Sequence, residues 1–117
     1  MNLALVTILV GNLIVTSYRS VPECTDDSPF ITSNGERVSP HGIAISRDLH
    51  KRWGGPLDYG DVVFVEGVGF KTVNDVMHQR HKRRADVWVA TLKDEQVFHK
   101  KFGHRKLRVY KIKEKTK

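Results

Sequence analysis

The segment DVVFVEGVGFKTVNDV, residues 61–76, decides the fold. Its first part, residues 61–66, is rich in valine and phenylalanine, which favour extended backbone on a half-buried sheet. Gly67-Val68-Gly69 supplies a turn, and residues 71–76 return as the partner strand. The centre of the chain is therefore predicted to be a β-hairpin.

The same patterns extend outward from this hairpin. Further strands are expected at residues 13–18, 42–45, 85–90 and 105–112. Residues 19–42 gather proline, aspartate and glycine and are expected to form loops, with the sharpest turn signal at Asn34-Gly35. Several short strands in one small chain predict a mainly β protein, folded as a closed or nearly closed small barrel.

One or two short helices accompany the strands. Residues 46–53 are predicted to form two helical turns with Ser46 as the N-cap. A second helix is predicted from the cap Thr91 to about Phe102, with Gly103 at its end.

The length, the cysteine count and the charge of the chain limit the number of domains and the kinds of partner. A chain of 117 residues has room for one domain, and its single cysteine, Cys24, excludes an internal disulfide framework and a cysteine-based zinc site. Residues 1–78 hold six Lys/Arg and nine Asp/Glu, whereas residues 79–117 hold fourteen and four, so −3 and +10 sum to the net charge of +7. The basic half predicts contact with a polyanion, either nucleic acid or a cell-wall polymer, unless it is only a solvated surface.

The N-terminal segment has three interpretations. Residues 1–12 are mostly apolar, but the apolar stretch is shorter than the about 20 residues that a spanning helix needs, and it lacks the basic start of a secretory signal. A degenerate signal, a weak anchor and a buried first strand all stay open. We expect residues 1–12 to be a separate apolar segment, residues 13–112 the barrel domain and residues 113–117 a basic tail, with the protein secreted or in the cell envelope.

Asp75 and Asp86 are the candidate active-site residues. Each lies within an apolar strand segment, where a carboxylate is disfavoured unless it is paired. Two carboxylates brought together raise one pKa, which provides a proton donor for glycosidic bond cleavage. Strand alternation places Trp88 on the same face as Asp86, where an indole can stack on a sugar ring. Composition leaves a structural alternative open, in which the aspartates cap turns or pair with neighbouring arginines.

The run from Gly42 to Ile112 resembles the three-aspartate (3D) domain family, a double-psi β-barrel family. That family is related to the C-terminal barrel of membrane-bound lytic transglycosylase A and to rare-lipoprotein-A-like proteins. Its motifs match this chain at residues 31–35 (ITSNG), 43–46 (IAIS), 63–69 (VFVEGVG), 74–76 (NDV), 85–87 (ADV) and 102–110 (FGHRKLRVY). The eleven-residue step from Asp75 to Asp86 also matches the family spacing.

The resemblance implies a six-stranded double-psi barrel that cleaves peptidoglycan glycan strands. Asp86 would be the general acid and then the general base, and Asp75 would orient the site and raise the pKa of Asp86. The 6-hydroxyl of the cleaved sugar would close a 1,6-anhydro ring, so no nucleophilic side chain is needed. No cofactor is expected, and the domain is expected to act as a monomer.

The remaining candidates surround this pair. Ser46 occupies the position of the first family aspartate, and Asp48, two residues on, is a possible substitute, although the first turn of a helix also stabilises a carboxylate there. His78 is a candidate beside Asp75, in a segment that lacks the glycines of the family. His78 and His81 have no third metal ligand at a suitable spacing, so no metal is expected.

Two further functions stay open besides cleavage. With Ser46 in place of an aspartate, the same barrel could hold glycan without cutting it. The basic residues 79–117 could instead bind nucleic acid or another polyanion, a partner that fits less well because few aromatic residues are spaced for base stacking.

Overall fold

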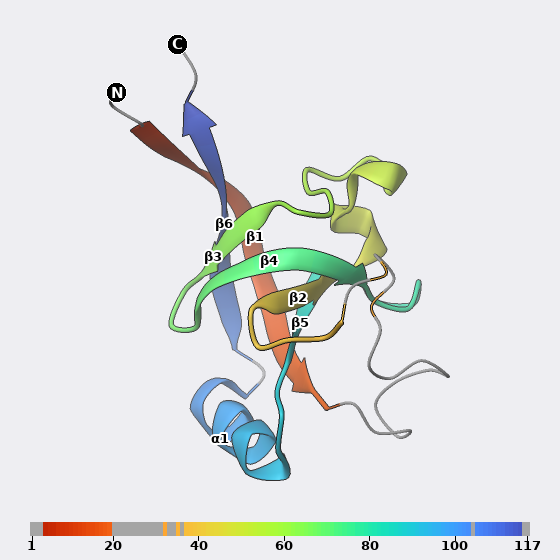
Figure 1. The fold of residues 1–117 in the computed structure, drawn as a ribbon, viewed down its shortest axis with the longest axis vertical. Helices are drawn as coiled ribbons and strands as arrows, with labels where there is room; N and C mark the ends of the chain where they lie inside the picture. The colour runs from red at the N-terminus through yellow and green to blue at the C-terminus, as the bar shows by residue number, and fades with distance from the viewer. Residues whose placement is uncertain (1–3, 20–31, 33–34, 36, 104, 116–117) are drawn as a thin grey trace.

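A computed structural model shows six strands, one α-helix and two short 3-10 helices (Figure 1). It describes residues 4–19, 32, 35, 37–103 and 105–115. The elements in chain order are β1 (Ala4–Tyr18), β2 (Gly42–Ile45), η1 (Arg47–Leu49), η2 (Lys51–Trp53), β3 (Val62–Val65), β4 (Gly69–Val76), β5 (Arg84–Trp88), α1 (Leu92–Phe102) and β6 (Lys106–Lys115).

The strands form a closed barrel in the order β1-β5-β2-β4-β3-β6. The sheet is mixed: β1 with β5 and β2 with β4 are parallel, and the other four pairs are antiparallel. The prediction of a small, mainly β, six-stranded barrel is therefore confirmed. Because β2 lies between β4 and β5, segments about 30 and 40 residues apart in the sequence become direct neighbours.

The core follows from strand alternation. Successive side chains of a strand point to opposite faces, and the inward set is apolar on every strand. The most deeply buried inward residues are Leu13, Val15, Ile43, Ile45, Val63, Val65, Val73, Ala85, Val87 and Val109. The side chains between them, on the outer face, are left to form a surface site.

The two termini lie together beyond the barrel. The outer part of β1 pairs with the end of β6, from Ala4 opposite Lys115 to Leu9 opposite Tyr110, and the ribbon projects from the barrel in Figure 1. Residues 4–12 and 113–115, which the sequence analysis placed in a separate N-terminal segment and a tail, lie in these two strands. None of the helices in the described ranges is long and apolar enough to cross a membrane.

The predicted helix at residues 46–53 is wrong in detail. His50 is extended, with φ −90° and ψ 139°, and it divides the segment into η1 and η2. Leu57 is the reason: its N–H donates to Leu49 O at 2.9 Å and its carbonyl accepts from Lys51 N at 2.6 Å, so the backbone needed for a continuous helix is paired elsewhere.

The other predicted elements agree with the structure within a few residues, except that β1 begins at Ala4, nine residues before the predicted start of the first strand. Thr91 caps α1 by accepting the N–H of Asp94 at 3.1 Å, and Gly103 follows Phe102 with a positive φ of 56°. Residues 19–42, predicted to form loops, lie largely outside the described residues, and so does Asn34. Gly35 N–H donates to Thr32 O at 2.9 Å.

Gly42 provides a test of the packing between β2 and β4. It is buried, and a Cβ at this position would collide with the side-chain amide of the buried Asn74. We expect Gly42→Ala to lower the free energy of unfolding by about 1–3 kcal/mol, as overpacking does, measured by urea denaturation. If the clash is the cause, most of this loss should vanish when Asn74→Ala is already present. Equal losses in both backgrounds would contradict the assigned contact.

Candidate active site

A row of four outward-facing residues crosses the barrel wall. In the strand registers Thr16 of β1 lies opposite Asp86 of β5, Asp86 opposite Ala44 of β2, and Ala44 opposite Asp75 of β4. Opposite residues on neighbouring strands share a face, and the neighbours of Asp86 along β5 point into the core. The two predicted aspartates thus flank a single buried alanine, with one strand between them.

A bulge in β4 places the side chain of Asp75 on the same face as this row. Ile43 pairs with Val73, but the next residue of β2, Ala44, pairs with Asp75, so Asn74 is the extra residue. A bulge changes the facing of the residues that follow it. Without it, Asn74 would stand opposite Ala44 and Asp75 would turn toward the core. Asp75 Oδ1 accepts the N–H of Val76 at 2.9 Å.

Asp86 has the environment of a proton donor. The pKa of its carboxyl is raised from 3.8 to about 6, chiefly by burial and to a smaller extent by the charges of Asp75 and Glu95. Two contacts act in the opposite direction: the Thr16 hydroxyl donates to Asp86 Oδ1 at 2.8 Å, and the Arg84 guanidinium lies nearby. The carboxyl can therefore exist in both protonation states near neutral pH, as a general acid and base must.

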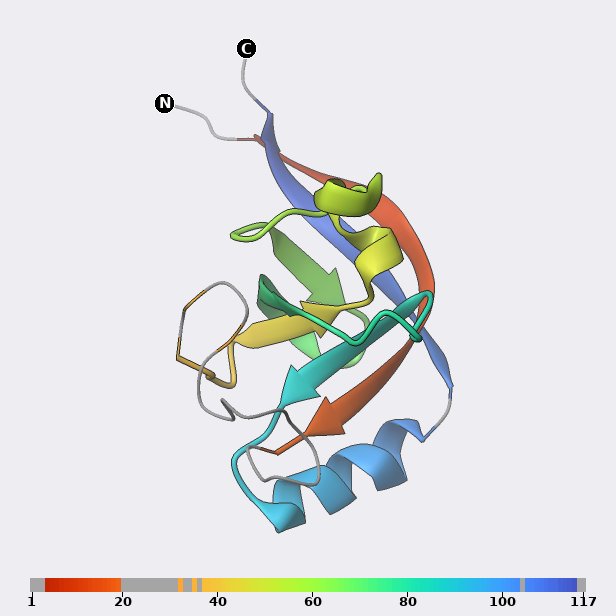
Figure 2. The same cartoon turned by 90° about the vertical axis from the view of Figure 1, so that its right-hand side faces the viewer.

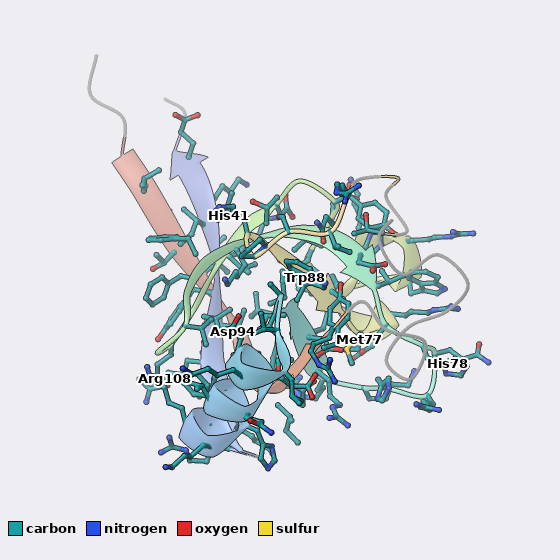
Figure 3. The ribbon with its side chains drawn as sticks, turned by 60° about the horizontal axis from the view of Figure 1, so that its bottom comes forward. His41, Met77, His78, Trp88, Asp94 and Arg108 are labelled. Carbon is teal, nitrogen blue, oxygen red and sulfur yellow. The ribbon has the colours of Figure 1, made fainter. Side chains whose placement is uncertain are left out.

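Tyr18 is the third titratable group of this cluster. Burial raises the pKa of its hydroxyl, and the nearby charges of Asp75 and Asp86 raise it further, so the hydroxyl stays protonated. Tyr18 follows Thr16 by two residues on β1 and lies opposite Trp88. Trp88 in turn shares the outer face with Asp86, as the sequence predicted, and Figure 3 shows it near the middle of this side of the molecule.

The helix α1 packs beside the same end of β1. Arg19, just after β1, forms an ion pair with Glu95 of α1 through its Nε, 3.1 Å from Glu95 Oε2. Figure 2 shows α1 at one end of the barrel and the 3-10 helices at the other, with β5 running between these ends. The strand that carries Asp86 therefore crosses the wall between them.

The other predicted site residues are not brought to the aspartates. Ser46 is fully buried, and its hydroxyl accepts the Arg84 N–H at 3.0 Å, which ties the end of β2 to the start of β5. Asp48 accepts the Arg83 N–H at 3.0 Å, in the first turn of η1 as expected. His78 is exposed in the loop after β4, where its Nδ1 accepts the Arg80 N–H at 3.1 Å, and Figure 3 shows it at the edge, away from Trp88.

Thr16 and Tyr18 are the residues that sequence reasoning missed as site candidates. Residues 13–18 were predicted to be a strand, and the alternation within it already set Thr16 and Tyr18 on the face opposite Leu13 and Val15. The sequence did not show which strand pairs with β1. Only the pairing of β1 with β5 places Thr16 and Tyr18 beside Asp86.

The cluster can donate and accept a proton next to a second carboxylate and a protonated phenol. Across the described part of the chain, no three His, Cys, Asp or Glu side chains gather in a way that could hold a metal ion. Compared with known proteins, the chain matches no protein-family model and no curated protein sequence. What the fold itself shows is a closed six-stranded mixed barrel.

Thr16→Val tests the hydrogen bond to Asp86. Because this bond stabilises the ionised carboxylate, its loss should raise the pKa of Asp86 by roughly one pH unit, measured by NMR titration of the labelled carboxyl carbon. Thr7→Val makes the same change in the outer part of β1 and should leave that pKa where it is. A pKa that moves equally in both variants, or falls in Thr16→Val, would contradict the assigned contact.

Asp86→Asn tests the burial of the carboxyl through the pH dependence of stability. The folded state holds this proton more tightly than the unfolded chain, since its pKa is about 6 rather than 3.8. The stabilisation is full below about pH 4 and is lost as the pH rises through about 6. The variant cannot ionise here, so its free energy of unfolding relative to wild type should rise by about 2–3 kcal/mol from about pH 4 to about pH 7.

Urea denaturation at both pH values measures this change. Glu66→Gln, which neutralises an exposed carboxyl at the end of β3, should not reproduce it. If the free energy of unfolding of Asp86→Asn relative to wild type were the same at both pH values, the carboxyl would be as well solvated in the folded protein as in the unfolded chain.

Proposed function

We propose that this protein cleaves the glycan strands of peptidoglycan in the manner of a lytic transglycosylase. The observation that carries the proposal is the raised pKa of Asp86, a partly buried carboxyl on the barrel wall, with Asp75 in the same row on the far side of β2. We also infer membership of the three-aspartate family, for which the ordered motifs across residues 42–112 and the six-stranded mixed barrel are the support. A double-psi connectivity and a place in the cell envelope or outside the cell belong to the same proposal.

The reaction needs one acid/base. Protonated Asp86 gives its proton to the glycosidic oxygen as the bond from that oxygen to the anomeric carbon breaks, and the leaving sugar departs as an alcohol. The carboxylate of Asp86 then takes the proton of the 6-hydroxyl of the remaining sugar. That oxygen closes on the anomeric carbon and forms the 1,6-anhydro ring. Asp86 ends the cycle protonated, and no water is consumed.

The neighbouring groups support each half of this cycle. Before bond cleavage, burial and the charge of Asp75 keep Asp86 protonated at a pH where an exposed aspartate is ionised. After cleavage, the Thr16 hydroxyl stabilises the new carboxylate through the 2.8 Å hydrogen bond. Trp88, on the same face, offers an indole for stacking against a sugar ring.

A glycan-binding barrel without turnover is the second candidate. Ser46, at the position of the first family aspartate, is buried, and its hydroxyl is occupied by the Arg84 N–H. The position of the first family aspartate therefore carries no carboxylate. The site keeps only Asp75 and Asp86 of the three family aspartates, which favours binding without cleavage.

Purified protein should release 1,6-anhydro-muropeptides from isolated peptidoglycan, detected by mass spectrometry. Asp86→Asn should lower the initial rate by at least about 100-fold, and the wild-type rate should fall as the pH rises above about 6 because the acid must be protonated. The Glu66→Gln variant should release anhydro-muropeptides at the wild-type rate. Unchanged cleavage by Asp86→Asn would sink the assigned role, and co-sedimentation with peptidoglycan without soluble product would establish the binding barrel instead.

A further inference from the structure

A pocket lies apart from the aspartate row, at the end of the barrel that carries η1 and η2. Its volume is about 280 Å³. The residues that line it come from the two 3-10 helices and from the loop between β4 and β5: Arg47, Asp48, Trp53, Gln79 and Lys82. None of them belongs to the acid/base cluster.

The pocket presents unpaired positive charge. Arg47 and Lys82 line it, and in the described ranges no carboxylate lies at ion-pair distance from either. Asp48 also lines the pocket and offsets one of these two positive charges, but its two oxygens accept the Arg83 N–H at 3.0 and 3.3 Å and it forms no ion pair with Arg47 or Lys82. Two cations and one carboxylate leave the lining with a net positive charge, and a concave site of this kind attracts an anionic group.

Trp53 holds the Arg47 guanidinium in place. The guanidinium carbons of Arg47 and Arg52 each lie 5.2 Å from the centre of its indole ring, within cation–π range. Arg47 Nε donates to Met77 O at 3.3 Å, which leaves the terminal nitrogens of its guanidinium free of that bond. A guanidinium fixed by stacking loses little conformational entropy when it binds a carboxylate with two parallel hydrogen bonds.

The pocket is close to the two aspartates along the chain. Met77, which Arg47 contacts, follows Asp75 by two residues, and Arg83, which Asp48 contacts, precedes Asp86 by three. At about 3.3 Å per residue for fully extended chain, these contacts lie at most about 7–10 Å along the backbone from the aspartates. A polymer bound at Asp86 can therefore reach the pocket with a side branch.

We propose that this pocket binds a free carboxylate of the peptide stem of the glycan, so that substrate is recognised by its acidic branch as well as by its sugars. This proposal rests on the proposed function for the choice of polymer. A carboxylate fits the planar guanidinium of Arg47 bidentately, and Lys82 supplies a second charge. Nucleic acid, the other polyanion that the basic loop suggests, is an outcome of the test.

The probe is the synthetic stem tetrapeptide L-alanyl-γ-D-glutamyl-L-lysyl-D-alanine, titrated to millimolar concentration against the labelled protein. The readout is the indole N–H resonance of Trp53, one of two tryptophans in the chain, assigned by its loss in Trp53→Phe. This resonance should shift with the tetrapeptide, and should stay in place with the carboxyl-amidated tetrapeptide and with chitotetraose. Arg47→Gln should weaken binding about tenfold, and Lys82→Gln should weaken it less.

Lys93→Gln, on α1 at the other end of the barrel, is the matched control and should bind like wild type. A Trp53 resonance that stays in place, that moves equally with the amidated peptide, or that responds only to inorganic phosphate or a short oligonucleotide overturns the assignment. The assay needs no bond cleavage. Tetrapeptide binding by a protein that releases no anhydro-muropeptides would therefore overturn the proposed cleavage and leave the pocket assigned.

Discussion

The buried carboxyl of Asp86 is the interaction on which the site depends. An ionised carboxylate on an apolar wall costs free energy, and the fold offsets only part of that cost with one short hydrogen bond from Thr16 and the charge of Arg84. The remainder appears as a pKa near 6. A fuller set of donors would have stabilised the charged form and left a permanently ionised aspartate, with no proton to give near neutral pH.

This partial compensation is a consequence of the strand order. β5 lies between β1 and β2, so Asp86 has a hydroxyl on one side and the methyl group of Ala44 on the other. The methyl group offers no hydrogen bond and little bulk. Asp75 can therefore act on Asp86 across β2 through its charge alone, and the bulge at Asn74 is what places Asp75 in that position.

The segment after β2 links the two ends of the wall. Ser46 and Asp48 bond to the backbone of Arg84 and Arg83, just before Asp86, and Arg47 bonds to Met77, just after Asp75. Residues that the sequence suggested as ligands of the substrate thus hold the two aspartate strands together. The same segment carries Arg47 and Trp53, which stack on each other and line the pocket next to the loop between β4 and β5.

The local pattern of residues was enough to predict most of the strands and helices and the class of fold, a small β-barrel. Valine-rich alternation, the turn at Gly67 and the cap at Thr91 act through backbone preferences of a few neighbouring residues, which a sequence displays directly. The same alternation predicted the shared face of Asp86 and Trp88. The continuous helix at residues 46–53 failed because Leu57, a residue outside the segment, takes its backbone hydrogen bonds.

The sequence by itself determined which side chains point outward along the regular stretches of strand, such as Asp86 on β5, because alternation has a period of two there, but not the facing of Asp75, which follows a bulge. It also singled out Asp75 and Asp86, since a carboxylate within an apolar strand is costly. Only the tertiary structure decided that Thr16 and Tyr18 join them and that Ser46 does not. Strand order, register and a one-residue bulge set those contacts, and they depend on the packing of segments distant in the chain.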